Sequence, residues 1–185
     1  MAIDADAASV AGRYFAQRLT EWAQLGNLRD YPWRHTRNPY VLLLTEMMLR
    51  RTRSDNVVPV FRRFFARWPT VCSFREAPCL EVRQVLDPLG LRWRIQNILD
   101  LRDALDGEDF SFERVLRLPG VGDYVASATA CFARDEPRPL IDTNLVRVLG
   151  RYFGFPVGPE TRRRKGLRDL ASALVPAEDP RTYNY

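Results

Sequence analysis

Apolar side chains recur every three to four residues along most of the chain, which is the spacing of amphipathic α-helices. Within residues 7–26, Tyr14, Leu19 and Trp22 follow this spacing, and Gly26 supplies a helix stop. The same pattern predicts helices over residues 40–53, 54–68, 80–86, 91–105, 111–117, 123–133, 143–150 and 159–174. Alternation of apolar and polar residues never persists beyond a few positions, so no strand is predicted. The expected fold class is all-α with short connections.

Capping and helix-breaking residues lie between these segments. Residues 30–39 contain two prolines and are predicted to form a connecting loop, in which Asn38 caps the following helix. Asp142 occupies the cap position of segment 143–150. The last predicted helix ends at about residue 174, and residues 179–185 show no capping signal.

Composition and charge narrow the class of protein. Hydrophobic residues make up 46% and charged residues 28% of the sequence, as in ordinary globular proteins. No apolar run approaches the ~18–20 residues that span a bilayer, and the first residues lack an export signal, so we expect a cytoplasmic protein. The net charge of +5 favours a polyanionic partner. Lys165 is the only lysine, and biased codon usage explains the excess of arginine as readily as phosphate binding does.

Few residues can bind a transition metal or act as a nucleophile. Cys72, Cys79 and Cys131 are widely spaced and form no C-x-x-C pair, so they cannot build a four-cysteine zinc or iron-sulfur site. We expect them to be buried thiols. His35 is the only histidine, which excludes multi-histidine metal sites and restricts any Ser-His-Asp triad to this residue.

A glycine-rich turn, Leu-Pro-Gly-Val-Gly at residues 118–122, separates two predicted helices. Gly120 and Gly122 can adopt conformations that expose successive N–H groups at the start of the next helix. Such a turn can bind phosphate, and a tight helix-helix turn without a ligand explains the glycines equally well. The positive net charge favours DNA as the source of that phosphate.

Two carboxylates are candidates for catalysis. Glu46 lies between Leu44 and Leu49, and if it is buried it must be paired, hydrogen-bonded or retained with a raised pKa for acid-base work. The alternative is an exposed glutamate that pairs with Arg50 one turn later. N-capping alone explains Asp142, but capping and catalysis are compatible because a helix start stabilises an anionic carboxylate.

Three motifs, in this order and spacing, resemble the helix-hairpin-helix DNA glycosylases of the endonuclease III and MutY superfamily. They are Glu-Met-Met-Leu-Arg-Arg-Thr at residues 46–52, Leu-Pro-Gly-Val-Gly-Asp-Tyr at 118–124 and Ile-Asp-Thr-Asn-Leu-Val-Arg-Val at 141–148. The similarity extends over about residues 8–174.

The resemblance implies a two-lobed helical fold, with a cleft between a six-helix bundle and a second helical lobe. The bundle would comprise residues 30–134 and contain the helix-hairpin-helix at about 111–133. The second lobe would be discontinuous, formed by residues 1–29 and 135–185. The implied partner is double-stranded DNA with a mismatched or damaged base, which is flipped into the cleft. A monomer associated with the nucleoid and not with a membrane is expected.

The resemblance also implies roles for individual residues. Asp142 falls at the catalytic aspartate, which stabilises the oxocarbenium-like sugar as the N-glycosidic bond breaks. Glu46 falls at a glutamate that assists departure of the base or positions the water. Tyr124 replaces the Schiff-base lysine of bifunctional members and the serine of adenine glycosylases, so strong AP lyase activity is not expected. Tyr124 and the stretch at residues 49–52 are similar to Mig-type enzymes, which remove T or U opposite G.

Contacts to DNA and ions are implied as well. Arg50 or Arg51 would fill the gap left by the flipped nucleotide or contact the orphan guanine, with simple phosphate binding as the alternative. Arg147 would also bind DNA. The DNA-binding residues of the hairpin would be Leu118, Gly120, Val121 and Gly122. The hairpin would bind phosphate and hold K⁺ or Na⁺ at the backbone of Leu118 and Val121. A [4Fe-4S] cluster would require the natural protein to extend beyond Tyr185.

The predicted function is therefore that of a monofunctional glycosylase acting on T or U opposite G. An adenine glycosylase acting opposite 8-oxoguanine or guanine would use the same Glu46 and Asp142, but Tyr124 and the Arg50-Arg51 pair disfavour it. A catalytically inactive helix-hairpin-helix DNA-binding module is the other alternative. The two retained carboxylates argue against such a module.

Overall fold

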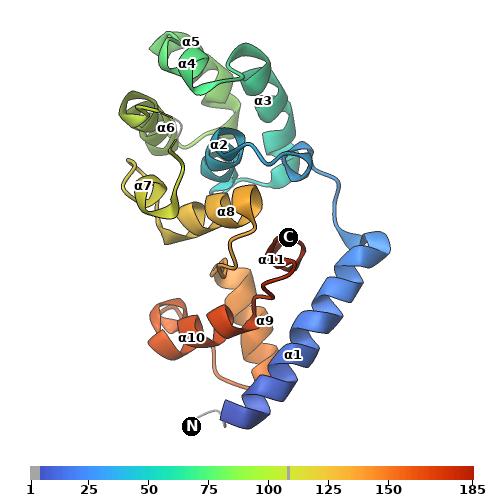
Figure 1. The fold of residues 1–185 in the computed structure, drawn as a ribbon. Coiled ribbons are helices and arrows are strands. Elements are labelled where there is room, and N and C mark those ends of the chain that lie inside the picture. The colour runs from blue at the N-terminus through green and yellow to red at the C-terminus, as the bar shows by residue number, and fades with distance from the viewer. Residues whose placement is uncertain (1–4, 108) are drawn as a thin grey trace. The chain divides into compact units, whose positions relative to one another are not determined.

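The computed structural model describes residues 5–107 and 109–185, and all regular secondary structure in this part of the chain is helical (Figure 1). The predicted all-α class is confirmed. None of the described helices is long and apolar enough to cross a membrane.

The chain divides into two compact units, each with its own hydrophobic core. One unit is residues 30–134, and the other combines residues 1–29 with residues 135–185. Because the chain leaves the second unit and returns to it, the first unit is an insertion between the first helix and the C-terminal helices.

The 30–134 unit is built around one buried helix. α2 (Pro39–Leu49) is buried from Leu42 to Met48 and packs against α3, α6 and α8 (Figure 1). A helix that is apolar on all sides is stable only when other helices cover it. The surrounding helices are α3 (Ser54–Arg67), α4 (Val71–Arg75), α5 (Cys79–Leu86), α6 (Arg92–Ala104), α7 (Phe112–Leu116) and α8 (Asp123–Arg134). In the described residues this unit therefore contains the α-helices α2 to α8.

The other unit joins the N-terminal helix to the last third of the chain. Its helices are α1 (Ala5–Trp22), α9 (Thr143–Phe153), α10 (Lys165–Leu174) and α11 (Pro180–Asn184). Phe15 of α1 packs in a shared core with Leu149, Ala171 and Tyr183. The α1 helix passes into a turn that ends beyond Gly26, whose φ of 81° is the left-handed conformation expected of a helix stop.

Two short helices, α4 and α11, were not predicted because each has only five residues, too few to show helical periodicity. α4 begins with a capping box in which Thr70 and Ser73 exchange side-chain to backbone hydrogen bonds. α11 is capped by Asp179, whose side chain accepts a hydrogen bond from the Thr182 N–H at 3.1 Å. The expectation that residues 179–185 lack a capping signal is therefore wrong.

Two further predictions need correction. The helix expected to reach residue 53 ends at Leu49, because Arg51 turns the backbone into the left-handed region with a φ of 56°. Cys131 is buried as expected, but Cys72 and Cys79 are exposed.

Candidate active site

Glu46 is buried in the middle of α2, with 7% of its surface exposed. Burial raises the pKa of its carboxyl to about 7, because the apolar surroundings disfavour the charged form. The alternative of an exposed glutamate paired with Arg50 is wrong, since the Arg50 guanidinium donates to the Gly120 carbonyl instead, at 2.8 Å. Glu46 can therefore exchange a proton near neutral pH, which is the property of a general acid or base.

The Glu46 carboxyl makes folding stability pH-dependent. Its folded-state pKa, about 7, lies above the ordinary value of 4.5, so the folded protein binds this proton more tightly than the unfolded chain does. The resulting contribution to the free energy of unfolding is complete below pH 4.5 and is lost as the pH rises through 7. We expect E46Q to match the wild type at pH 4 and to exceed its free energy of unfolding by about 3 kcal/mol at pH 8. Urea unfolding at both pH values measures this difference. A constant difference across the range would show that Glu46 does not titrate in this way.

The turn after α2, residues 50–53, separates the roles of the two adjacent arginines. Arg50 is engaged within the protein, because its guanidinium donates to Gly120 and lies 5.1 Å from the centre of the Trp93 ring. Arg51 is exposed and has the left-handed backbone conformation. Strained conformations of bulky residues cluster at functional sites, so Arg51 is the better candidate for contact with a ligand.

The glycine-rich turn joins α7 to α8 and has the form of a compact hairpin. The Val121 N–H donates to the Leu118 carbonyl at 3.1 Å, and Leu118 is buried. Gly120 has a φ of 72°, and a Cβ atom at this position would lie 2.7 Å from Cβ of Asn97. A side chain at position 120 would therefore clash with α6, and Gly120 itself is exposed.

The aromatic residue at the start of α8 is Tyr124, which is 37% exposed. Lys165, the only lysine, is the first residue of α10 in the other unit. The structure therefore places no lysine amine in the 30–134 unit, where Glu46 and the hairpin lie.

Asp142 is held at the start of α9 through both of its carboxylate oxygens. Oδ1 accepts from the Leu145 N–H at 2.7 Å and Oδ2 accepts from the Asn144 amide at 2.9 Å. The carboxylate is only half-buried. It is thus a fixed negative charge that still reaches solvent, an arrangement suited to electrostatic stabilisation of a cation.

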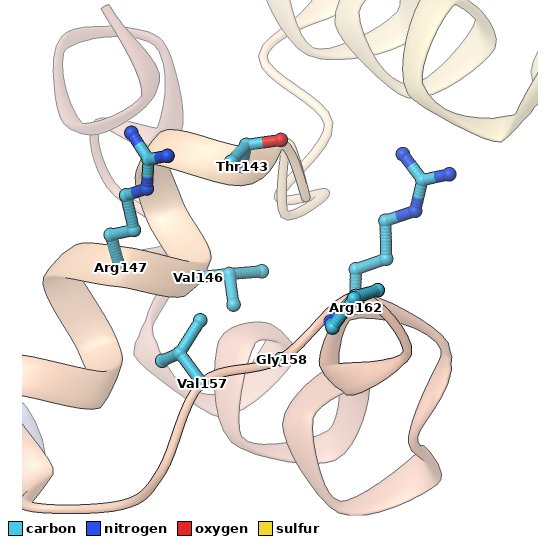
Figure 2. Close-up of a pocket in the computed structure, with 7 residues that line it drawn as sticks. Thr143, Val146, Arg147, Val157, Gly158 and Arg162 are labelled. Carbon is cyan, nitrogen blue, oxygen red and sulfur yellow. The ribbon is translucent and has the colours of Figure 1, made fainter.

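Arg147 is exposed one turn beyond Asp142 and lines a hollow of about 340 Å³. Figure 2 shows Arg147 and Arg162 on opposite sides of this hollow, with the Thr143 hydroxyl between them. Its remaining lining is mostly apolar and comprises Val146, Val157, Gly158 and Pro159. Both guanidinium groups are placed to attract an anion.

The predicted site residues fall in both units. Glu46, Tyr124, the 50–53 turn and the hairpin belong to residues 30–134, and Asp142 and Arg147 belong to the other unit. Inside the 30–134 unit, the Arg50 to Gly120 hydrogen bond joins the turn to the hairpin.

The residues present do not fit an iron-sulfur cluster. Across residues 5–107 and 109–185, no group of three or more His, Cys, Asp and Glu side chains could hold a metal ion.

The sequence did not reveal two side chains that hold the candidate site residues in place, Asn144 and Arg94. Asn144 holds the second oxygen of Asp142, and its place two residues after a capping aspartate was the available signal. Arg94 is fully buried and hydrogen-bonds to the turn after α2. Nothing in the periodicity of α6 distinguished Arg94 from an exposed arginine, because the pairing joins residues more than 40 positions apart.

The chain is similar in sequence and in fold to known DNA glycosylases. Residues 44–173 match the HhH-GPD superfamily of base excision DNA repair proteins. A thymine/uracil-DNA glycosylase of Methanothermobacter thermautotrophicus is 34% identical over 172 residues, which cover 90% of this chain and 77% of that protein. The structure of a thermostable thymine-DNA glycosylase superimposes with a TM-score of 0.85 at 32% identity, covering 94% of this chain and 82% of that one. The chain belongs to the HhH-GPD superfamily.

Adenine glycosylases are also similar, over less of their length. An adenine DNA glycosylase of Mycobacterium tuberculosis is 34% identical over 139 residues, which cover 72% of this chain but 45% of that protein. The resemblance drawn from the three motifs, including the likeness to thymine glycosylases, is thus confirmed.

Proposed function

We propose that this protein is a monofunctional DNA glycosylase that hydrolyses the N-glycosidic bond of thymine or uracil opposite guanine. The observation that carries the proposal is the burial of Glu46 in α2, which holds its pKa near 7. Burying a carboxyl is unfavourable for folding, so such a group is expected where a reaction uses its proton. The thymine- and uracil-specific relatives named above, similar over most of the chain, support the choice of substrate.

The chemistry divides between the two carboxyl groups. As the bond from C1′ to the base nitrogen breaks, its electron pair leaves with the base and positive charge develops on the deoxyribose. Asp142 stabilises this charge, and its two hydrogen bonds keep it from moving away. Protonated Glu46 donates to the departing pyrimidine, and water then adds to C1′ and releases a proton.

Tyr124 determines how the reaction ends. A Schiff base needs a primary amine beside C1′, and position 124 offers only a phenol. The product is therefore an intact strand with an abasic site, which breaks only under alkali.

Contacts to the duplex are supplied by the exposed basic and backbone groups. Arg51 enters the gap left by the flipped nucleotide or contacts the orphan guanine, since the Arg50 side chain is engaged by Gly120 and Trp93. The hairpin binds backbone phosphate, and its backbone at Leu118 and Val121 would hold K⁺ or Na⁺. Arg147 contributes a further phosphate contact, and the protein acts as a monomer.

Labelled duplexes carrying T:G, U:G, A:8-oxoguanine or A:G pairs test the proposal. After incubation, one half of each sample is treated with alkali and the products are separated by size. We expect cleavage only after alkali and only in the T and U strands. Cleavage of the adenine strand would identify an adenine glycosylase, and binding without any cleavage would indicate an inactive module.

A further inference from the structure

Arg94 has an unusual environment for an arginine. Its side chain is completely buried, and none of the ion pairs formed by the described residues includes it. Burying a guanidinium without a carboxylate is unfavourable, and an apolar side chain of similar volume would serve folding as well. Burial and the nearby charge of Arg50 lower the pKa of Arg94 accordingly. Its hydrogen bonds must therefore account for its presence.

The five acceptors of Arg94 lie at the end of α2, on the turn that follows it, and on residues 89–90. Nη1 donates to the Met48 carbonyl at 2.9 Å, to the Thr52 hydroxyl at 2.8 Å and to the Arg50 carbonyl. Nη2 donates to the carbonyls of Leu89 and Gly90 at 2.5 and 3.3 Å. One planar group thus ties the 50–53 turn to residues 89–91, which we call the Leu91 loop.

Both loops carry an exposed side chain in a strained conformation. Arg51 has a φ of 56° and Leu91 a φ of 58°, and both are exposed. A strained backbone conformation persists only where the surrounding structure fixes it, so the carbonyls beside these two residues need partners within the protein. Arg94 contacts the carbonyls of Arg50 and Gly90, each immediately before one of the strained residues.

The first turns of α6 also contact the hairpin. Trp93 lies against the Arg50 guanidinium, which donates to Gly120, and Asn97 packs so closely on Gly120 that no Cβ would fit between them. Residues 93–97 of α6 therefore contact the 50–53 turn, the Leu91 loop and the hairpin, all within one compact unit.

We propose that Arg94 is a positioning residue that fixes the 50–53 turn and the Leu91 loop relative to the hairpin, so that all three meet a lesion-containing duplex as one rigid surface. The inference rests on the proposed function for the identity of that duplex. An arginine is required because lysine has a single nitrogen and cannot reach both loops at once.

The test compares R94K with R102K, a matched control on the same helix. Arg102 is also buried, but it donates to the Ala77 carbonyl at 2.8 Å and to Asp103, away from the three loops. Binding is measured to a duplex with a tetrahydrofuran abasic analogue opposite guanine and to the same duplex with a G:C pair. Hydrogen exchange is measured on peptides covering residues 49–53 and 88–92.

We expect R94K to exchange these loop amides about tenfold faster and to bind the abasic duplex at least about tenfold more weakly. Binding to the G:C duplex should change less than about twofold, because the net charge is unchanged. R102K should leave both the loop exchange and the ratio of the two affinities as in the wild type. T52V, which removes one acceptor of Arg94, should shift the ratio in the same direction by a smaller factor.

Three results would overturn the inference. The first is an equal fall in the ratio of the two affinities in R94K and R102K. The second is faster exchange of the loop amides in R94K with an unchanged ratio. The third applies if R94K does not fold, and is an unchanged ratio in T52V. Absence of base release by the wild type on every duplex would overturn the proposed function alone, because the inference is measured by exchange and binding.

Discussion

Replacing Asp142 with asparagine is expected to lower the single-turnover rate of base release by about 10³-fold, the loss typical of removing a group that stabilises transition-state charge. Asparagine retains an oxygen that can accept from the Leu145 N–H, so the cap of α9 survives. The melting temperature should therefore change by less than about 2 °C. Excision from a U:G duplex and thermal unfolding of the same preparation measure the two effects.

Asp179 offers a matched control in the same unit. It also caps a helix through its side chain, at α11, and D179N makes the same chemical change. D179N should retain wild-type excision. Equal activity of D142N and the wild type would remove Asp142 from the mechanism and leave it as a cap alone.

Replacing Glu46 with glutamine is expected to lower kcat/KM by about 10²-fold at pH 6, the usual contribution of general acid catalysis. In the wild type, kcat/KM should be constant below the pKa of about 7 and fall tenfold per pH unit above it, because the protonated carboxyl is the active form. Glutamine cannot transfer a proton, so the profile of E46Q should be flat. Rates measured from pH 5.5 to 8.5 at low substrate concentration test this.

An exposed glutamate of the same unit controls for the change in charge. Glu81 in α5 is exposed, and E81Q should keep both the wild-type rate and its pH profile. A wild-type rate that rises through pH 7 would instead make Glu46 a general base that activates the water. A profile without inflection near 7 would exclude both roles.

The sequence by itself determined the fold class and most of the helices. Helical periodicity is a local property, and caps such as Asn38 and Asp142 act within four residues, so both can be read from neighbouring positions. The three motifs were sufficient to identify the superfamily and its thymine-specific branch. The candidate catalytic residues Glu46, Asp142 and Tyr124 also came from the sequence, and their roles are proposals that the experiments above test.

Only the tertiary structure decided which charged residues are buried and what each one contacts. Glu46 and Arg50 stand one helical turn apart and could have formed a surface pair, but the packing of α3, α6 and α8 around α2 buries the glutamate. The Arg50 side chain is directed to Gly120, 70 positions away, and Arg94 to acceptors 42 to 46 positions away. Burial and hydrogen bonding depend on groups that are distant in sequence, and periodicity carries no information about them.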